Sequence, residues 1–201
     1  MVERIRRAAK AALGDETFLF MAYALIVFRP GATPPFFPMG NATQPRPIPD
    51  NWTDAEMIAF IEEGRIDAAA QQADKRDIRA RAQIILTTAI VLGGTWVKSF
   101  SSSEDLCACE TVLYLVAGLF IGLTMLAAGG IITARSDVGA VSVSALTHYE
   151  TGEVLHTVAT GYAVTRLVGS QTIAALVTVL RDCVVTLIVG AGLLALAHLL
   201  R

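Results

Sequence analysis

Three long apolar stretches constrain the fold of this 201-residue chain more than any other feature. They occupy residues 82–97, 111–134 and 183–200. As helices rising about 1.5 Å per residue, they would reach roughly 24, 36 and 27 Å, against a bilayer hydrocarbon core of about 30 Å. Only 17% of the residues are charged, which is few for a soluble domain. We therefore predict an all-α integral membrane protein with about three transmembrane helices and cytoplasmic amphipathic helices; three buried helices of a soluble core are the alternative.

The first apolar stretch begins directly after a strongly charged segment, residues 74–81. No Gly or Pro lies between Arg65 and Leu92, and most residues there favour helix, so one helix is expected to cross the change of polarity without a break. Because Lys98 can extend its ammonium group towards water, the same helix can continue to Phe100. The boundary between charged and apolar residues then marks the point where this helix is expected to pass from water into lipid.

The distribution of basic residues predicts the orientation. Of the 16 Lys and Arg residues, eleven lie in residues 1–81 and three in residues 135–182, which leaves only Lys98 and Arg201 for the other side. Basic residues are retained on the cytoplasmic side, so the N-terminus is expected in the cytoplasm of a cell with an inner membrane. The charges expected at the membrane interface are Lys75, Arg76, Arg79, Arg81, Arg135, Arg181 and Asp182. Burying the last two within the bilayer would cost roughly 2.5 to 3.5 kcal/mol each, so an interfacial position is favoured over a polar seam inside a span.

The sequence divides into three parts. Residues 1–50 hold a basic segment, an apolar run at 17–28 that is too short to span, and a proline-rich stretch at 30–49. The run is expected to pack on protein or to lie at the membrane surface, and the proline-rich stretch to be a linker or a ligand for another protein. Residues 51–81 form a cytoplasmic helical segment. Residues 82–201 form the membrane domain, with a cytoplasmic segment at 135–182.

Helix boundaries in the cytoplasmic parts follow from short signals. Thr53 and Glu56 match a capping box, with Trp52 before it, and Gly64 is predicted to end a short amphipathic helix before a longer one begins. Residues 135–170 suit either a hairpin around "ETGE" or helices, and helical spacing favours helices. Ser170 is then the expected cap of the helix leading into the last span.

Small residues recur at helical spacing in the second and third spans. In the second, Gly118, Gly122 and Gly129 share a face with Met125, and such a groove lets another helix backbone approach closely. A shorter face in the third span is formed by Gly190, Ala191 and Ala195. Packing among the three spans and self-association between copies are both compatible with these faces.

No pattern in the sequence indicates catalysis. The three histidines have no ligand-type neighbours at metal-binding spacing, and no phosphate loop or nucleophile elbow is present, so we expect no enzyme, metal or cofactor. The net charge of −2 gives no reason to expect a nucleic-acid partner. Cys107 and Cys109 are interpreted as ordinary thiols or as sites of an intermolecular disulfide.

The segment "QQADKRDIRARAQIILTTAIVLGG", which begins at Gln71, resembles the small transmembrane effectors of Pycsar-type bacterial anti-phage systems. The resemblance is specific over residues 71–92 and extends elsewhere only to the order of spans; the proline-rich stretch and residues 18–28 depart from it. It implies a dormant inner-membrane protein that responds to a cyclic pyrimidine nucleotide and then impairs the membrane. No matched motif identifies a ligand-binding residue.

Two hypotheses for the function follow. The first is a multi-pass inner-membrane effector of anti-phage defence that answers a cytoplasmic signal, with the lipid bilayer and other copies of the chain as partners and a cyclic nucleotide as a possible ligand. The second is a non-catalytic accessory subunit of a larger membrane complex. A transporter is disfavoured because three spans offer few polar groups to line a pathway.

Overall fold

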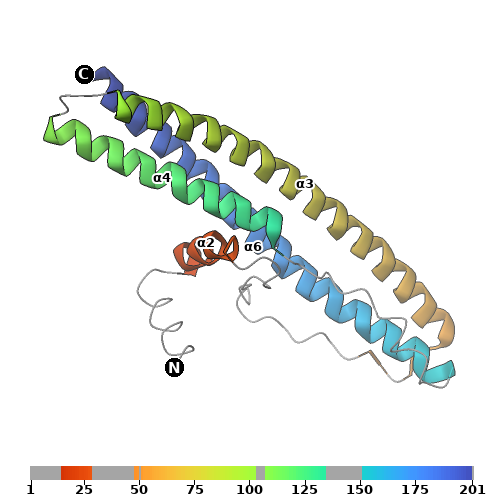
Figure 1. Cartoon of the computed structure of the whole chain (residues 1–201). Coiled ribbons are helices and arrows are strands. Elements are labelled where there is room, and N and C mark those ends of the chain that lie inside the picture. Colours follow the sequence, from red (N-terminus) through yellow and green to blue (C-terminus); the bar gives the residue numbers. More distant parts are fainter. Residues whose placement is uncertain (1–14, 29–47, 50, 103–106, 135–150, 201) are drawn as a thin grey trace. The chain divides into compact units, whose positions relative to one another are not determined.

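The structure of the chain is a computed structural model that describes residues 15–28, 48–49, 51–102, 107–134 and 151–200. Within these ranges every regular element is a helix, which confirms the predicted all-α class. The helices are α2 (Asp15–Ile26), α3 (Asp54–Ser101), α4 (Ala108–Thr133) and α6 (Thr151–Leu199) (Figure 1).

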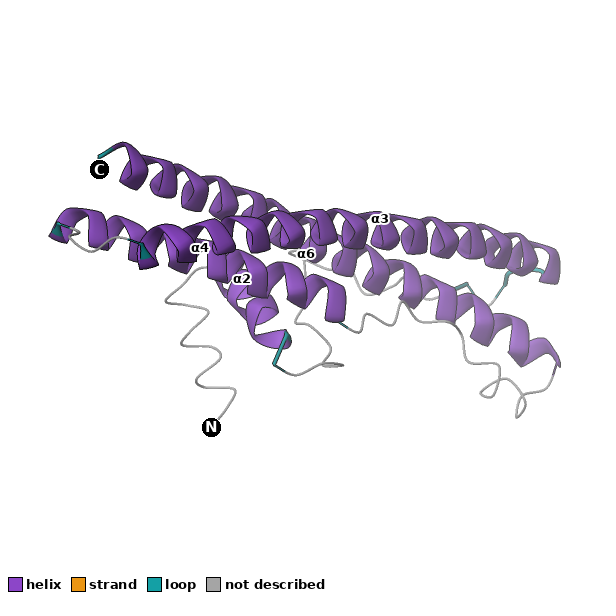
Figure 2. Ribbon diagram, turned by 45° about the horizontal axis from the view of Figure 1, so that its top comes forward, coloured by secondary structure: helices purple, strands orange, loops and turns teal. Residues whose placement is uncertain are grey.

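Three of these helices are long and apolar enough to cross a membrane. In α3, α4 and α6 the most apolar windows have mean hydropathies of 1.4, 2.3 and 2.1. Helix α2 is also apolar, but it is much shorter than the other three (Figure 2). The number of spans predicted from the sequence is therefore confirmed. The helix also continues beyond Lys98 as expected, since α3 ends at Ser101.

The chain divides into two units, and α3 and α6 each belong to both. Among the described residues, unit 1 holds α2, α4, the part of α3 from Ile78 and the part of α6 from Leu176. Unit 2 holds the earlier parts of α3 and α6. The segment before the first span and the segment before the last span therefore belong to one unit, although they are far apart in the sequence.

The start of α3 is the predicted capping box. The backbone N–H of Thr53 donates to the Glu56 carboxylate at 2.7 Å, and the Glu56 N–H approaches the Thr53 hydroxyl at 3.4 Å. Trp52, which precedes the cap, packs edge-on against Phe60 in the second turn of α3. The predicted helix end at Gly64 is wrong, because α3 continues through it. A Cβ at residue 64 would lie 2.8 Å from that of Tyr162, so this glycine permits a close approach of α6 rather than a turn.

Helix α6 also begins earlier than predicted. It starts at Thr151 and runs without a break, so the prediction of helix over the hairpin is confirmed for residues 151–170. Residues 135–150 lie outside the described ranges. The prediction that Ser170 caps a new helix is wrong. Its hydroxyl donates to the carbonyl of Leu167 inside α6, which satisfies the side chain within a continuous helix.

In unit 1, α4 packs antiparallel to both α3 and α6. A buried hydrophobic core between these helices is formed by Tyr114, Ala117, Leu194 and Ala197. Trp96, Phe100, Leu113 and Leu193 pack around it. The short α2 packs on α4, as expected for an apolar run that cannot span, and Tyr23 is fully buried there.

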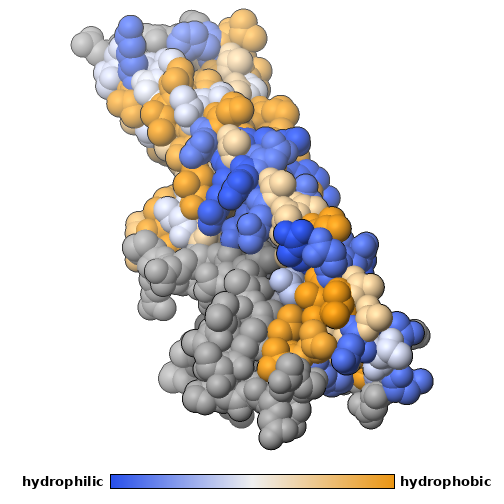
Figure 3. Space-filling model, turned by 90° about the vertical axis from the view of Figure 1, so that its right-hand side faces the viewer, coloured by the Kyte–Doolittle hydropathy of each residue, from blue (hydrophilic) through white to orange (hydrophobic). Residues whose placement is uncertain are grey.

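Large apolar side chains nevertheless remain exposed on every long helix of unit 1. They include Ile84, Val91, Leu119 and Ile188. The face drawn in Figure 3 includes exposed hydrophobic areas beside hydrophilic ones. Such exposure is costly in water and is the normal condition of a helix surrounded by lipid.

Candidate functional site

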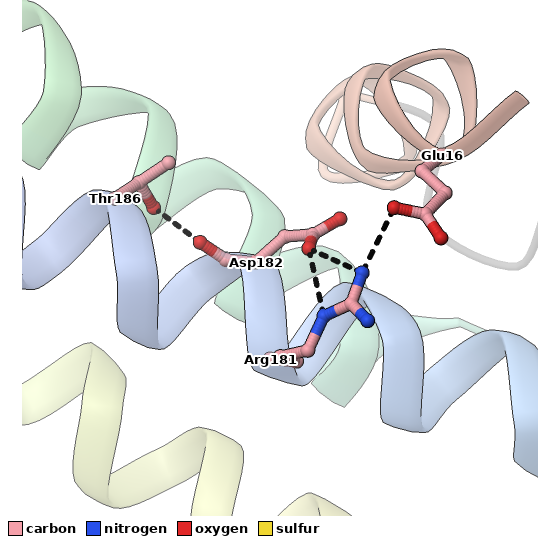
Figure 4. Close-up of polar contacts among 4 residues, drawn as sticks. All are labelled: Glu16, Arg181, Asp182 and Thr186. Atoms are coloured by element: carbon pink, nitrogen blue, oxygen red, sulfur yellow. Dashed lines mark hydrogen bonds and ion pairs between the residues drawn. The ribbon is translucent and has the colours of Figure 1, made fainter. Parts of the chain in front are cut away.

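The clearest polar site in unit 1 surrounds Arg181, which stands with Asp182 immediately before the third apolar stretch. The Arg181 guanidinium lies 2.9 Å from a carboxylate oxygen of Glu16 and 3.3 Å from one of Asp182 (Figure 4). It therefore connects the first turn of α2 to α6. The Arg181 and Glu16 side chains are 59% and 66% exposed, so water screens their attraction and the pair contributes little stability.

A second polar contact lies further along α6 and joins it to α4. The Thr186 hydroxyl donates to the backbone carbonyl of Asp182 at 2.8 Å (Figure 4). The Thr186 hydroxyl oxygen also lies 2.8 Å from the hydroxyl oxygen of Thr124. Thr124 is fully buried, and its hydroxyl also donates to the backbone carbonyl of Phe120 in α4. Because threonine hydroxyls can be satisfied within a helix, breaking the contact between the helices leaves no unpaired group. The contact is specific and easily exchanged.

Arg79 connects α3 to the end of α4. One guanidinium nitrogen of Arg79 donates to the carbonyl of Ala134, which is the C-cap of α4, at 2.8 Å. The last carbonyls of a helix have no partners within it and carry a partial negative charge, so a cation is favourable there. Arg79 thus has a structural contact in addition to its predicted interfacial position.

The remaining predicted interfacial charges differ in exposure. Lys75 is half-buried, whereas Arg76 and Arg81 are exposed on α3. Both Lys75 and Arg81 interact with other groups. Arg135 lies outside the described ranges.

The predicted small-residue face of α4 has different neighbours along its length. A Cβ at Gly118 would lie 2.6 Å from the indole of Trp96 on α3, so this glycine accommodates a large side chain. Nothing lies within 4 Å of the same position at Gly122. Met125 instead projects its methyl group against Gly93 of α3.

Towards its C-terminus, the same face meets the N-terminal segment. A Cβ at Gly129 would lie 3.1 Å from Val27, which follows α2. On α6, Gly190 is buried against Ile121 of α4, while Ala191 is half-buried and Ala195 exposed. Among the described residues, Gly118 therefore faces α3, Gly129 faces Val27 just after α2, and Gly190 faces α4, all within the same chain.

Sequence reasoning missed an aromatic site at the other end of the bundle. The Trp96 indole N–H donates to the Tyr114 carbonyl at 2.6 Å, and the Tyr114 hydroxyl lies 3.2 Å from Nδ1 of His198. Phe100 stacks on Trp96. The available signal was the position of Trp96 and Tyr114 near span ends, where amphipathic aromatic rings are enriched.

A polar site in unit 2 was also missed. Arg166 of α6 lies 3.1 Å from the carboxylate of Asp67 on α3, and the Gln71 side-chain amide donates to the Arg166 carbonyl at 3.2 Å. These residues share no local motif, since they lie about a hundred positions apart. Only the pairing of α3 with α6 brings them together.

In the described part of the chain, no group of three His, Cys, Asp or Glu residues could hold a metal ion. Cys183 is buried, whereas Cys107 and Cys109 are exposed near the start of α4. Several of the sites described above are weak polar contacts between helices.

The comparisons with known proteins give no relative from which a function could be transferred. No family model, curated protein or solved structure matches the chain.

Proposed function

We propose that the protein is a multi-pass inner-membrane effector in which a signal received by unit 2 changes the packing of the spans and impairs the membrane. The observation that carries the proposal is the continuity of α3 and α6, each of which runs unbroken from unit 2 into unit 1. A helix without a break transmits displacement or rotation along its axis, whereas a flexible linker would absorb it.

The proposed orientation places unit 2 in the cytoplasm. It rests on the excess of Lys and Arg in residues 1–81 and 135–182. The resemblance of residues 71–92 to the small transmembrane effectors of Pycsar-type anti-phage systems supports defence as the setting and a cyclic pyrimidine nucleotide as the signal. The resemblance covers the very segment where α3 passes from charged to apolar residues.

The contacts within unit 1 suit a resting state that a modest signal can change. Arg181 with Glu16, Thr186 with Thr124 and Arg79 with the end of α4 are each weak or readily replaced. In addition, only 6% of the most apolar window of α3 is buried, against 39% for α4. Helix α3 therefore has a large surface available for lipid in one state and for other helices in another.

The test is inducible expression in a bacterial host with a dye that reports membrane potential. We expect healthy cells until a cyclic pyrimidine nucleotide synthase is induced, followed by rapid loss of potential. A variant with a Gly-Gly-Ser insertion after Asp77 should insert normally but no longer respond, because the insertion interrupts α3. Unchanged potential with every cyclic nucleotide tested would contradict the proposal.

The large exposed surface of α3 also supports a second candidate, a non-catalytic subunit of a larger membrane complex. The face left uncovered within this chain would then pack on another protein. Purification from the native membrane at a fixed stoichiometry with other subunits, without any effect of expression on membrane potential, would favour this candidate over the effector.

A further inference from the structure

In unit 2, the side of α3 that faces away from α6 is exposed over several turns. The contacts of Gly64 with Tyr162 and of Asp67 with Arg166 define the side that faces α6. At 3.6 residues per turn, the opposite side carries residues at alternating steps of four and three, starting from Ala55. All of them are exposed, and together they are called the outer face of α3: Ala55, Ala59, Glu62, Ile66, Ala69 and Ala73.

The outer face exposes large apolar side chains in a part of the helix that lipid does not surround. Ile66 is 55% exposed, and Ile58, at the edge of the face, is 56% exposed. Residues 54–77 carry ten charged side chains and precede the apolar stretch at residues 82–97, so this part of α3 lies outside the hydrocarbon core. An apolar helix face exposed to water is typical of a contact with protein.

The charged residue within the outer face is compatible with such a contact. The carboxylate of Glu62 accepts two hydrogen bonds from the guanidinium of Arg65 on the same helix, at 2.7 and 3.0 Å. Its charge is therefore balanced without any partner from another chain. The alanines above and below Glu62 have short side chains, so a second helix can approach the face closely.

Charges of opposite sign border the two sides of the outer face. Between residues 63 and 76, the exposed charged residues are Arg65 and Arg76 on one side and Glu63 and Asp74 on the other. When two such helices pack in parallel about a two-fold axis, the basic side of each lies beside the acidic side of the other. In an antiparallel pair, each side would lie beside its own copy, and like charges would repel.

We propose that the outer face of α3 in unit 2 binds the same face of a second copy of the chain, with the two helices parallel. The membrane requires the same direction, because copies oriented by the same distribution of basic residues insert in the same sense. The acidic side of the face disfavours an anionic lipid surface as the occupant. The pairing goes beyond the proposed function and does not rest on it, since neither a nucleotide nor a change of membrane potential is involved.

The test is cysteine cross-linking of the full chain in bacterial membranes. Residues 72, 73 and 74 are consecutive and all exposed, but only Ala73 lies on the outer face. Each is replaced by Cys in turn, and dioxygen with copper phenanthroline oxidises the thiols. The native cysteines are first removed by the substitutions Cys107→Ser, Cys109→Ser and Cys183→Ala.

The three positions have different expected outcomes because of the two-fold axis. Equivalent residues near the axis meet, whereas equivalent residues on the two sides of the face are held apart. Ala73→Cys should therefore give a disulfide-linked dimer on a non-reducing gel, and Gln72→Cys and Asp74→Cys should not. Ala69→Cys, one turn earlier on the same face, is a second position expected to form the dimer.

One further substitution separates a specific contact from chance collision. Ile66→Gln removes an exposed apolar side chain from the outer face, so it should lower the cross-linking of Ala73→Cys severalfold while helical circular dichroism stays unchanged. Val164→Gln makes the same kind of change at an exposed residue of α6 in unit 2. It is the matched control and should leave the yield of dimer unaltered.

Equal cross-linking at residues 72, 73 and 74 would overturn the proposal, and so would the absence of a dimer at both Ala69→Cys and Ala73→Cys. Cross-linking of residue 73 to a different protein at fixed stoichiometry would also overturn it and would favour the accessory-subunit candidate. The expected dimer in cells whose membrane potential never responds to a cyclic nucleotide would contradict the proposed function alone.

Discussion

The docking of α2 on α4 depends on Gly130, and this dependence can be tested directly. A Cβ at residue 130 would meet the carbonyl oxygen of Tyr23 and lie 2.8 Å from its carbonyl carbon. These atoms belong to the backbone of α2, so they cannot rotate away as the end of a side chain would. Gly130→Ala is therefore expected to push α2 off α4.

The expected size of the effect follows from the kind of obstruction. Inserting a methyl group into a well-packed contact typically costs about 1 to 3 kcal/mol. At about 1.4 kcal/mol for each factor of ten, the equilibrium between docked and detached α2 should shift by about 5-fold to 150-fold. The Arg181–Glu16 ion pair cannot compensate, because both side chains are mostly exposed.

Amide hydrogen exchange measures this equilibrium segment by segment. In Gly130→Ala, the amides of residues 18–26 should exchange faster by the same factor, while those of α3 in unit 2 stay unchanged. Gly122→Ala on the same helix is the control, because nothing lies within 4 Å of a Cβ there. Equal exchange of α2 in the two variants would refute the role assigned to Gly130.

Three further predictions concern single contacts. The Thr53 backbone N–H and hydroxyl donate to the Glu56 carboxylate and lower its pKa below the ordinary value for glutamate, so the cap is fully present above that ordinary pKa and is lost as the pH falls through the lowered one. Thr53→Ala keeps the backbone N–H, the larger cause, and removes only the hydroxyl, so an NMR titration should raise the pKa of Glu56 part of the way back to its ordinary value; an unchanged titration would contradict the role of the hydroxyl. Arg79→Gln should accelerate amide exchange in the last turn of α4, and Arg79→Lys should accelerate it less because the cation remains; equal protection in all three chains would argue against the cap. Trp96→Phe, which loses the N–H that bonds the Tyr114 carbonyl, should lower the free energy of unfolding in detergent by about 1 kcal/mol, and an unchanged thermal midpoint would show that this bond contributes nothing.

The features that could be predicted from the sequence are those set by local chemistry. The three spans follow from the length and polarity of their own residues, and the start of α3 follows from two side chains three positions apart. The failures at Gly64 and Ser170 have a shared cause. Judged from neighbouring residues alone, both residue types often mark helix ends. Here the hydroxyl of Ser170 bonds to a carbonyl within α6, and Gly64 leaves room for Tyr162 of α6. Contacts across helices override local preference.

The same distinction applies to the predicted packing faces. Glycine spacing on α4 indicated a groove but not its occupants, since the positions of α3, α6 and α2 around α4 are not encoded in α4 itself. Gly118 meets Trp96, Gly129 meets Val27, and Gly122 meets nothing within 4 Å. A regular spacing can therefore serve several unrelated contacts, each with its own energetic cost when the glycine is replaced.

Contacts between helices in this chain are of two kinds, and the difference bears on how the protein could respond to a signal. Glycine contacts such as Gly64 with Tyr162 and Gly130 with Tyr23 define position sharply, because a shift of one residue replaces space with a clash. Polar contacts such as Arg181 with Glu16 and Thr124 with Thr186 cost little to exchange. A molecule held by sharp but individually weak contacts passes between discrete arrangements instead of deforming gradually. In the proposed effector, this combination, joined to two helices that run unbroken through both units, would let the spans change from one packing to another.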